Sequence, residues 1–423
     1  MSVKIDHFKG YEILDSRGRP TVMAKCYLSD GTMGKASVPS GASTGKAESV
    51  ELRDGNLGRY AGLGCQKAVG HINQEINQAV SGLSFDQKEL DHTLIRLDGT
   101  PNKGNLGANA ILACSLAFAK ACAIQQDLPL FKYFGGLLAA NSFRLPRLTV
   151  NLFSGGKHAG GQVPIQDLLI VPISAMTVEQ ALSDLYKVYY SATDIIRKKY
   201  GMRTLTADEG GLAPSFNHID EMLDTALESI EKAGFKPGQD IALAMDIASS
   251  HFYEGGKYHI NEEKLTGMEQ IALLSDWVAK YPIVSLEDGL AEDDWDHWPE
   301  LNKKIGGKSL VLGDDLLCTQ TSRIQKAIDT HSANALLLKV NQCGSITDAL
   351  EAFKLAKSAG WQVTVSARSG ETEDDWLADL AVGWSGNQIK VGSITQSERL
   401  AKYNRLLEIE KDHPEIKMAP WKY

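Results

Sequence analysis

Six apolar segments in the last two thirds of the chain each end in a charged residue. These residues are Asp246, Glu287, Asp314, Lys339, Arg368 and Lys390. Successive members lie 22 to 41 residues apart, which leaves room for a helix between one segment and the next. In a barrel of parallel strands, each strand is buried on both faces and its carboxyl end opens onto the rim where active sites are built. The spacing therefore predicts an α/β barrel with three acids and three cations at one rim.

Asp246, Glu287 and Asp314 are candidate metal ligands. Three carboxylates packed together repel one another unless a cation neutralises them, and oxygen ligands suit a hard divalent ion such as Mg²⁺. Taken singly, each acid could instead cap the helix that follows its strand. Capping does not explain Lys339 and Lys390, because a lysine in an apolar strand is unfavourable to bury without a charged partner or a catalytic role. The five residues together favour a metal-dependent catalytic site.

Length and composition indicate an enzyme of more than one domain. The chain has 423 residues, of which 43% are hydrophobic, and exceeds the usual size of one compact domain. A formal net charge of −9 argues against a nucleic-acid partner, because binding to phosphate backbones depends on basic patches. The six cysteines contain no C-x-x-C pair and fit reduced thiols. Since neither a signal peptide nor a membrane span is apparent, we expect a cytoplasmic protein.

The first third of the chain differs in pattern from the rest. Alternating apolar residues predict antiparallel strands, and three- and four-residue spacing predicts helices. The expected strands are 5–14, 21–28 and 32–38, and the expected helices are 49–53, 66–80, 87–97 and 106–126. A strand meander followed by helices is typical of an α+β domain. Because turn residues accumulate over 134–147, we expect an α+β cap domain at 1–136 and the barrel at 137–423.

A loop of small residues, SVPSGASTGKAE at 37–48, joins a predicted strand to a predicted helix. Gly41 and Gly45 give its backbone freedom, and the hydroxyls of Ser40, Ser43 and Thr44 could bind a metal or a phosphate. Loops of this composition are also common as solvent-exposed linkers. From its residues alone, the loop is either a mobile lid over the rim or a plain linker.

Segments in order along nearly the whole chain resemble the enolase family. They include DSRGRPTV, SVPSGASTG, NLFSGGKHAGG, ADEGGLAP, VSLEDGLAEDDW, LLLKVNQCGS and ARSGETEDDW. The resemblance implies an enolase-type eight-stranded α/β barrel with a partly antiparallel start and an N-terminal α+β cap domain. It also implies a homodimer or a higher assembly, two Mg²⁺ ions per active site, and the glycolytic dehydration of 2-phospho-D-glycerate to phosphoenolpyruvate.

The resemblance further implies roles for the metal and base positions. Asp246, Glu287 and Asp314 would bind the tighter metal ion, and Ser43 in the loop would bind the second. Lys339 would be the base that removes the α-proton. To accept a proton near neutral pH its pKa must fall, and burial beside metal charge and Lys390 would lower it. Metal charge would also stabilise the doubly charged enediolate that proton removal creates.

Two groups of residues would hold the substrate by the same resemblance. Lys390 would bind the substrate carboxylate, with Gln166 as a further binding residue. Arg368 and Ser369 would bind the phosphate, since a planar guanidinium can donate two parallel hydrogen bonds to an oxyanion. The expected ligand is therefore a small phosphorylated carboxylate.

Three residues would act on the leaving hydroxyl. Glu209 resembles the general acid, Asp167 the acid that assists it, and His158 the pocket histidine nearby. Without the resemblance, Glu209 could simply begin a helix beside a glycine turn. His158 could be an ordinary turn residue in a glycine-rich loop.

Three positions depart from the family pattern. The family usually has Glu at the position of Asp167, His at that of Ala367 and Pro at that of Gly289. The shorter Asp167 should retreat from the leaving group, and such a misplacement can lower the rate about 100-fold. Ala367 removes a pocket donor, and Gly289 should loosen a rim turn by freeing φ. The metal and base positions are retained, so the departures affect the part of the site that handles the far end of the substrate.

Three functions follow from this pattern. The first is a phosphopyruvate hydratase with reduced turnover. The second is a divergent enolase paralogue acting on a related phosphorylated or phosphonylated hydroxy acid, for which Ala367 makes room. The third is a non-catalytic binding or structural protein. Lys339 and Lys390 argue against the third, because a scaffold has no reason to retain cations that are unfavourable to bury.

Overall fold

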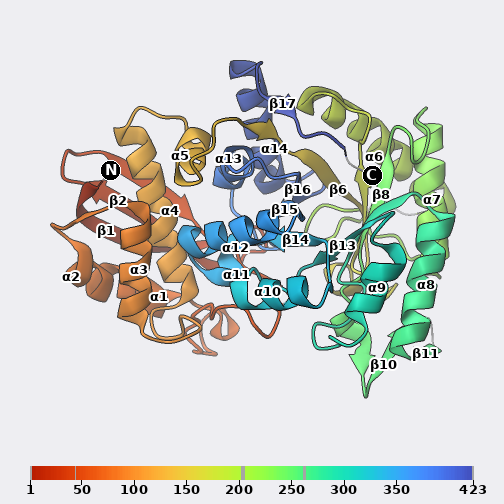
Figure 1. Ribbon diagram of the computed structural model, residues 1–423, viewed down its shortest axis with the longest axis horizontal. Helices are drawn as coiled ribbons and strands as arrows, with labels where there is room; N and C mark the ends of the chain where they lie inside the picture. The colour runs from red at the N-terminus through yellow and green to blue at the C-terminus, as the bar shows by residue number, and fades with distance from the viewer. Residues whose placement is uncertain (1, 43, 202–204, 261–262, 422–423) are drawn as a thin grey trace.

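The computed structural model describes residues 2–42, 44–201, 205–260 and 263–421, and it shows a cap domain on one side of a closed barrel (Figure 1). The barrel order is β12-β13-β14-β15-β16-β6-β7-β8. Its strands are β6 Arg147–Ser154, β7 Asp167–Val171, β8 Ala242–Asp246, β12 Ile283–Glu287, β13 Leu310–Gly313, β14 Ala335–Leu338, β15 Gln362–Ser366 and β16 Gln388–Gly392. Neighbours are parallel except where β7 pairs with β6 and β8. The predicted barrel with a partly antiparallel start is confirmed.

Alternation along the strands determines which side chains enter the barrel. Residues two apart in a strand share a face. Two apolar clusters lie apart from the main core: Leu310, Leu312, Ala335 and Leu337 in one, and Leu169, Val171 and Ala244 in the other. When the two-residue alternation is continued along the same strands to the rim, Asp314, Lys339 and Asp246 fall on the same face as these clusters. The inner apolar layers therefore end in a layer of charged groups.

The reversed direction of β7 brings its first residue, and not its last, to the active rim. Asp167 begins β7 and pairs in register with Ser154 at the end of β6 and with Asp246 at the end of β8. Gln166 immediately precedes the strand. One wall of the barrel mouth is therefore formed by Gln166 and Asp167, which come before an apolar segment, whereas the six charged residues predicted at the rim follow one.

Helices cover the outside of the barrel (Figure 1). They are α6 Val178–Tyr200, α7 Ile219–Lys232, α8 Gly267–Lys280, α9 Trp298–Ile305, α10 Thr321–Asp329, α11 Val340–Cys343, α12 Ile346–Ser358, α13 Trp376–Gly383 and α14 Ser397–Asp412. Short elements at its ends are β5 Arg144–Leu145, η3 Gly156–His158, η4 Ser249–Phe252, β9 Tyr253–Glu254, β10 Lys257–Ile260, β11 Glu263–Leu265 and β17 Lys417–Met418. Side-chain oxygens of Thr177, Thr266 and Ser345 accept backbone N–H groups at the starts of α6, α8 and α12. These caps fix where the helices begin.

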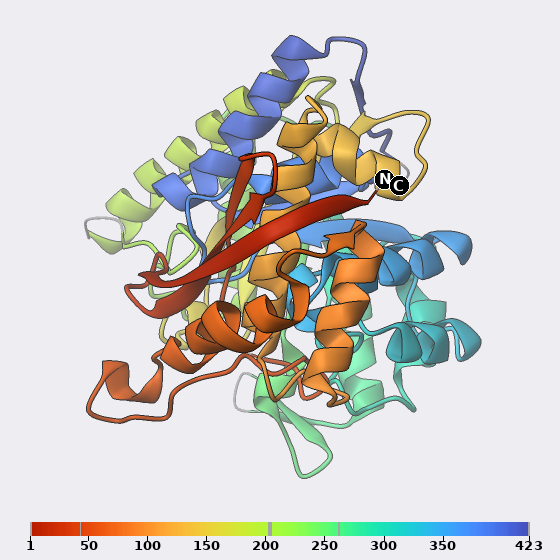
Figure 2. The ribbon, with the colours of Figure 1, turned by 90° about the vertical axis from the view of Figure 1, so that its left-hand side faces the viewer.

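The cap domain is an antiparallel sheet packed on helices, as predicted. The sheet order is β3-β2-β1-β4, with β1 Val3–Leu14, β2 Pro20–Leu28, β3 Met33–Ser37 and β4 Ser84–Phe85. The helical segments are η1 Tyr60–Gly62, α1 Gln66–His71, the π-helical η2 Ile72–Ile76, α2 Asn77–Val80, α3 Gln87–Asp98, α4 Ala108–Gln125 and α5 Leu130–Leu137. The helix α4 packs against β2 and β3, behind the sheet in Figure 2. Among the described residues, α4 alone is long and apolar enough to span a membrane, and 83% of it is buried inside the protein.

The prediction of a helix over 49–53 is wrong. Its backbone bonds to other segments: Ser49 N donates to Gln342 O at 2.8 Å, and Val50 N donates to Asn102 O at 2.8 Å. Because these N–H groups are already satisfied, the segment gains nothing from a local helical turn. It runs instead as an irregular connection along the seam between cap and barrel.

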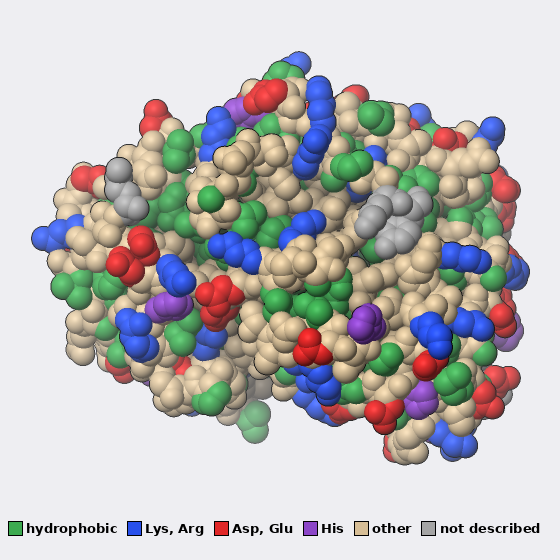
Figure 3. Space-filling view, in the orientation of Figure 1, with side chains coloured by type: hydrophobic (Ala, Val, Ile, Leu, Met, Phe, Trp, Pro, Cys, Tyr) green, Lys and Arg blue, Asp and Glu red, His purple; other side chains and the backbone are tan. Residues whose placement is uncertain are grey.

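Buried polar contacts fasten the cap to the barrel. Asp91 in α3 accepts hydrogen bonds from Thr347 N at 2.9 Å and Thr347 Oγ1 at 2.6 Å. Lys103 Nζ lies 2.8 Å from the Asp348 carboxylate. These contacts join α3 and the segment that follows it to the start of α12, and basic and acidic side chains are interspersed over the face shown in Figure 3. The expected division at residue 136 falls within α5 and remains a prediction.

Candidate active site

A small cavity at the rim gathers most of the predicted site residues. It is lined by Ala42, His158, Gln166, Glu209, Asp246, Lys339, Ser366, Ala367, Arg368, Ser369 and Lys390. Lys339 directly follows β14, whereas His158 lies between β6 and β7. Since β14 and β7 are four places apart in the ring of eight strands, they lie across the barrel from each other. The cavity therefore has a lysine on one side and a histidine and a glutamate on the other.

Lys390 lies inside β16 and is held between two carboxylates. Its Nζ lies 2.9 Å from Asp246 Oδ2 and 2.9 and 2.8 Å from the two oxygens of Glu287. Burial would lower the pKa of Lys390, but Asp246 and Glu287 hold it well above its ordinary value. Burial likewise raises the pKa of Asp246, and the Lys390 ammonium overcomes this and brings it to about 2. Lys390 is thus a fixed positive charge on the inner wall.

Lys339 is held by Asp314. Its Nζ lies 2.5 Å from Asp314 Oδ2, while Gln342 Nε2 donates to Asp314 Oδ1 at 2.8 Å. Burial and the Arg368 guanidinium both act to lower the pKa of Lys339, but the Asp314 carboxylate gives a net rise. The expected fall in pKa is therefore not found in the protein alone. Lys339 is an ammonium for as long as Asp314 is its partner.

On the side of the cavity that holds the lysines, the negative charge of the buried carboxylates exceeds the positive charge of the lysines. Burial, and next the Asp246 carboxylate, raise the pKa of Glu287 well above its ordinary value, although Lys390 opposes the rise. Burial, then Asp314, raise the pKa of Asp315 to about 7. A divalent cation would neutralise this excess, and the donor set is all oxygen, as Mg²⁺ prefers. These residues therefore fit a hard cation.

The grouping of the acids differs from the predicted trio. Two groups of described residues bring three ligand atoms within 4.8 Å of one another, namely His158, Asp167 and Glu209, and Asp288, Asp314 and Asp315. Asp246, Glu287 and Asp314 are not such a group in the described part of the chain, because Lys390 lies between the first two and Lys339 pairs with the third. Ser43, the predicted ligand of a second ion, lies outside the described residues.

Asp288 joins the rim ends of two neighbouring strands. Its Oδ1 accepts from Asp314 N at 2.9 Å, and its Oδ2 accepts from Asp315 N at 2.7 Å. Its φ of +44° lies in the left-handed region, which is unfavourable for a residue with a side chain. The two hydrogen bonds hold this conformation and set Glu287 and Asp314 relative to each other.

The described parts of the loop, residues 37–42 and 44–48, close onto the rim. Glu48 accepts from Arg368 Nη1 at 2.9 Å and from Arg368 Nη2 at 3.2 Å, and Ala42 N donates to Ser369 Oγ at 2.8 Å. Ser40 and Gly370 exchange backbone hydrogen bonds of 2.8 and 2.9 Å. These contacts favour the lid interpretation over the plain linker. Glu48 presents to Arg368 two carboxylate oxygens, in the place where a substrate phosphate would offer its own oxygens.

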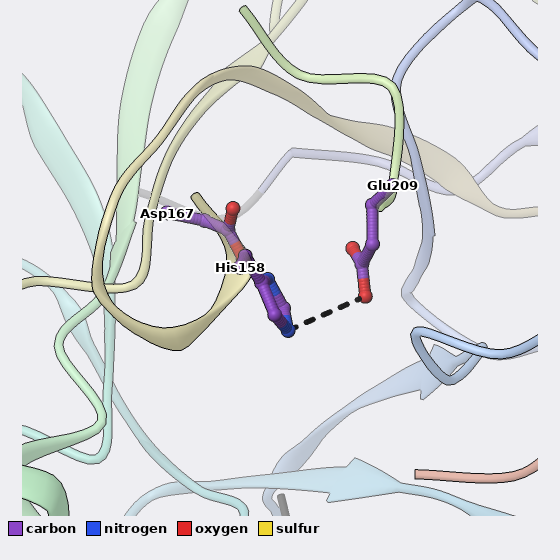
Figure 4. Close-up of side chains that lie close together, drawn as sticks. All are labelled: His158, Asp167 and Glu209. Carbon is purple, nitrogen blue, oxygen red and sulfur yellow. Dashed lines mark hydrogen bonds and ion pairs between the residues drawn. The ribbon is translucent and has the colours of Figure 1, made fainter. Parts of the chain in front are cut away.

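His158, Asp167 and Glu209 form a chain of contacts on the opposite side (Figure 4). His158 Nδ1 lies 2.8 Å from Asp167 Oδ2, and Ser154 Oγ donates to Asp167 Oδ1 at 2.6 Å. His158 Nε2 faces Glu209 Oε1 at 4.0 Å, and Asn151 Nδ2 donates to Glu209 Oε2 at 3.0 Å. Asp167 is fully buried and, unlike the other two, does not line the cavity.

The protonation states of His158 and Glu209 differ from those expected if Glu209 were the general acid. Burial alone would lower the pKa of His158, but Asp167 and Glu209 raise it to about 9. Burial raises the pKa of Glu209, yet His158, Arg399 and the lysines bring it below its ordinary value. At neutral pH the proton is therefore on His158, and Glu209 is a carboxylate.

Gln166 lies between the two sides of the cavity. Its Nε2 donates to Asp246 Oδ2 at 3.1 Å. Its Oε1 is buried and has no hydrogen-bond partner within the described part of the protein. A buried amide oxygen without a partner is unfavourable, so this atom is suited to accept a hydrogen bond from a ligand.

Two family departures have a clear structural setting. Ala367 is 7% exposed and lines the cavity beside Arg368, so the position faces the ligand. The φ of Gly289 is not positive, so the turn does not use the backbone conformation that favours glycine, and the expectation of a looser turn stays a prediction. A Cβ at Gly289 would lie 2.3 Å from Leu286 Cδ2 and 3.0 Å from Leu274 Cδ1. A side chain at 289 would therefore require the ends of these leucine side chains to shift.

Sequence reasoning missed four residues that organise the site: Glu48, Asp288, Gln342 and Arg399. Asp288 directly follows Glu287, and Gln342 stands three residues after Lys339, so adjacency to a predicted residue was an available signal. Arg399 had none. It is fully buried and donates to Arg368 O at 2.7 Å, Val391 O at 3.0 Å and Ser369 O at 2.5 Å, which fixes the backbone of the predicted phosphate-binding pair.

Comparison with known protein families agrees with the fold. Residues 5–134 match the enolase N-terminal domain, and residues 142–418 match the enolase C-terminal TIM barrel domain. The two matches occur in the order of the cap and the barrel and cover most of the chain. With its rim of lysines and buried carboxylates, the chain is an enolase-type hydro-lyase or a close paralogue of one, and it belongs to the enolase family.

Proposed function

We propose that this protein dehydrates 2-phospho-D-glycerate reversibly to phosphoenolpyruvate. The observation that carries the proposal is the placing of Lys339 across one small cavity from His158 and Glu209. Removal of a proton from C2 and departure of the C3 hydroxyl need a base and an acid on different sides of the substrate. A three-carbon acid is short enough to contact both sides at once.

The charged walls of the cavity support a phosphorylated carboxylate as the substrate. Lys390 offers an ammonium to a carboxylate near Lys339, and Gln166 offers an unpartnered oxygen to a hydroxyl. Arg368 offers its guanidinium to a phosphate, with Ser369 beside it. For a phosphate to take both guanidinium bonds, it must displace the Glu48 carboxylate or share Arg368 with it.

We propose Mg²⁺ as the cofactor, with two ions per site, bound by Asp246, Glu287 and Asp314 and by Ser43. Members of the enolase family are generally metal-dependent, and the buried carboxylates here exceed the lysines that neutralise them. Bound cations would stabilise the negative charge that develops on the substrate carboxylate. Lys339 can act as the base only after its ammonium has lost a proton, and Asp314 favours the ammonium form by pairing with it. Cation binding and the base role therefore both depend on Asp314.

A direct test mixes the purified protein with Mg²⁺ and 2-phosphoglycerate and follows the absorbance of the enol product. Turnover that requires Mg²⁺ supports the proposal. A parallel measurement by NMR follows exchange of the C2 proton with solvent deuterium, which reports the Lys339 step even if dehydration is slow. Absence of both signals, with tight binding of a substrate analogue, would abandon 2-phosphoglycerate as the substrate.

A related substrate is the second candidate, favoured by the cavity position of Ala367. Replacing the usual histidine by alanine opens space beside Arg368, where a phosphonate or a larger phosphorylated hydroxy acid could bind. A panel of three-carbon phosphates and phosphonates, assayed with the wild type and with Ala367→His, distinguishes the two. A gain on 2-phosphoglycerate in Ala367→His indicates the ordinary substrate. A loss confined to another panel member indicates the paralogue.

We further propose a cytoplasmic homodimer that acts in glycolysis. The family resemblance supports the homodimer and the glycolytic role, and large apolar side chains are exposed on the surface: Leu57 is 83%, Tyr186 55% and Tyr190 50% exposed. The rings of Tyr186 and Tyr190 lie 4.4 Å apart on α6, and contiguous exposed apolar groups often mark a protein interface. Light scattering coupled to gel filtration measures the assembly, and a monomer at micromolar concentration would contradict the dimer.

A further inference from the structure

We propose that Arg17, in the turn between β1 and β2 of the cap domain, is a positioning residue that fixes the hydroxyl of Ser369 as a hydrogen-bond donor to an anionic oxygen of the ligand. Arg17 is not among the residues lining the cavity, so it acts through Ser369 and does not touch the ligand. The inference rests on the proposed function for the phosphate that the ligand carries. It adds a cap residue to a site otherwise built by the barrel and the loop 37–48.

The guanidinium of Arg17 has a fixed place. Asp15 Oδ2 accepts from Arg17 Nη2 at 3.0 Å and from Nε at 3.3 Å, and Asp15 Oδ1 accepts from the backbone N of Arg17 at 2.8 Å. The side chain of Asp15 is fully buried, and that of Arg17 is 6% exposed. The turn is also tied to the barrel, since Ser16 N donates to Glu371 O at 2.7 Å. Arg17 is therefore held at the junction of cap and barrel.

Gly370 provides the space for this pair. A Cβ at Gly370 would lie 2.2 Å from Asp15 Oδ2 and 2.3 Å from Arg17 Nη2. A residue without a side chain is needed where another chain segment approaches the backbone this closely. Since Gly370 directly follows Ser369, the cap is seated on the segment predicted to bind the phosphate.

Two donors occupy the acceptor positions of the Ser369 hydroxyl. Arg17 Nη1 donates to Ser369 Oγ at 3.1 Å, and Ala42 N donates to it at 2.8 Å. Neither a guanidinium nor a backbone N–H can accept a hydrogen bond, whereas a hydroxyl accepts two and donates one. The proton of Ser369 Oγ therefore points away from both donors, and it has no acceptor among the residues that the structure describes. Because Ser369 lines the cavity, that proton is available to a ligand.

Arg17 also contacts the loop 37–48. Its Nη2 donates to Ser40 O at 3.0 Å, two residues before Ala42, whose N–H is the second donor to Ser369. Both acceptor positions of the hydroxyl are therefore filled only when residues 40–42 lie against the rim. Through Arg17, the position of the loop and the orientation of the Ser369 hydroxyl depend on each other.

A hydroxyl fixed as a donor selects for the kind of group that it meets. Its partner must be an oxygen that accepts, and the guanidinium of Arg368, which only donates, makes the same demand beside it. Hydrogen bonds in series polarise one another, so donation by Arg17 makes the Ser369 O–H a stronger donor. The pair is therefore suited to an unprotonated phosphate or phosphonate oxygen, and unsuited to a hydroxyl or amide N–H that must itself donate.

The test measures binding of phosphoglycolate, a phosphorylated carboxylate without a leaving hydroxyl, by calorimetry with Mg²⁺ present. Arg17→Met and Ser369→Ala should each weaken binding by about 10-fold, as expected for one hydrogen bond to a charged group. The double variant should bind no more than about 3-fold more weakly than Ser369→Ala, because Arg17 acts through that hydroxyl. Single losses that multiply in the double variant, unchanged binding in Arg17→Met, or no binding by the wild type would overturn the inference.

The matched control is Arg19→Met, in the same turn but with an exposed side chain, which should leave binding unchanged. If Arg17→Met does not fold, Arg17→Lys replaces it in the same comparison. Its single ammonium keeps the charge beside Asp15 but cannot take the places of three guanidinium nitrogens. Binding by Arg17→Lys that equals the wild type, or a loss that multiplies with that of Ser369→Ala, would again overturn the inference.

Kinetics separate this inference from the proposed function and from a merely structural role. Phosphoglycolate binding needs no turnover, so the expected losses in a protein that fails to dehydrate 2-phosphoglycerate would contradict the proposed function alone. With turnover, Arg17→Met should raise KM by about 10-fold with a much smaller change in kcat, because the hydrogen bond holds the phosphate throughout the reaction. A fall in kcat at unchanged KM would indicate a structural role for Arg17 and would overturn the inference.

Discussion

The two sides of the cavity are built on different principles. On the side of β8, β12, β14 and β16, each lysine is fixed directly by carboxylates: Lys390 by Asp246 and Glu287, and Lys339 by Asp314. On the side of β6 and β7, one imidazole is fixed by a carboxylate behind it and faces another at 4.0 Å. The first side carries more negative than positive charge, which a cation could neutralise. The second leaves a gap between His158 Nε2 and Glu209 Oε1 that one oxygen atom fits. The first keeps the lysines and carboxylates that resemble the family but includes the departure at Gly289, while the second contains the departure at Asp167.

The largest expected effect tests whether the lysine side does the proton abstraction. Lys339→Met should lower C2-proton exchange by roughly 1,000-fold, because it removes the only proposed base. His158→Gln should lower exchange far less, since it acts on the opposite side. Both rates come from one NMR time course in deuterated solvent. Lys304→Met, on the outer helix α9, is the matched control. Persisting exchange in Lys339→Met would remove this residue from the base role.

The next prediction concerns the carboxylates of the lysine side. Chelation with EDTA should stop turnover, and Mg²⁺ should restore it. Glu287→Gln should raise the melting temperature of the metal-free protein by about 2 °C, because Glu287 is unfavourable as a buried charge there. The same substitution should reduce the further rise that Mg²⁺ gives the wild type. Scanning fluorimetry with and without Mg²⁺ measures both.

Glu300→Gln on α9 is the control for that experiment, since Glu300 is exposed. An unchanged Mg²⁺ response in Glu287→Gln would mean that Glu287 is not a ligand. A lower metal-free melting temperature would mean that its bonds to Lys390 outweigh the repulsion from Asp246.

A third prediction concerns the pH dependence of the histidine side. Because the pKa of His158 is raised to about 9, its ion pairs stabilise the fold fully below the unfolded pKa of about 6.5, and this contribution is lost as pH rises through about 9. The contribution is on the order of 3 kcal/mol. The carboxylates that raise the pKa of His158 are Asp167, Glu209 and Asp246, and His251 is a further titratable group that interacts with it. Urea unfolding of wild type and His158→Gln between pH 6 and pH 10 should therefore converge at the alkaline end. A gap that stays constant over this range contradicts the raised pKa.

The smallest effect concerns the packing beneath the lysine side. Gly289→Ala should lower the free energy of unfolding by about 1 to 3 kcal/mol, because the new Cβ overlaps Leu286. Gly136→Ala in α5 is the matched control, since no atom lies within 4 Å of its added Cβ. That control should be neutral or slightly stabilising. Equal stability of Gly289→Ala and the wild type would restore the idea of a loose turn.

The sequence predicted where the charged residues of the lysine side lie on the barrel but not how its acids are grouped, and it predicted the histidine side only in part. Apolar runs that end in charge located Asp246, Glu287 and Asp314, since a parallel strand buried on both faces has a clear pattern. Asp167 and Gln166 stand before an apolar run, and only the antiparallel direction of β7 brings them to the same rim. The helix expected over 49–53 failed because its backbone groups bond to distant segments, which no local pattern reports.

From the order of its residues alone, the chain specifies a barrel, a separate cap and a rim rich in acids and lysines, because burial and strand period are local properties of sequence. The partner of each charge was decided in three dimensions: Lys390 between two carboxylates, Asp167 behind His158, and Glu48 on Arg368. Such pairings depend on distances between segments that lie far apart in the chain. The location of a proton depends in turn on those distances, which is why only the folded protein shows it on His158 and not on Glu209.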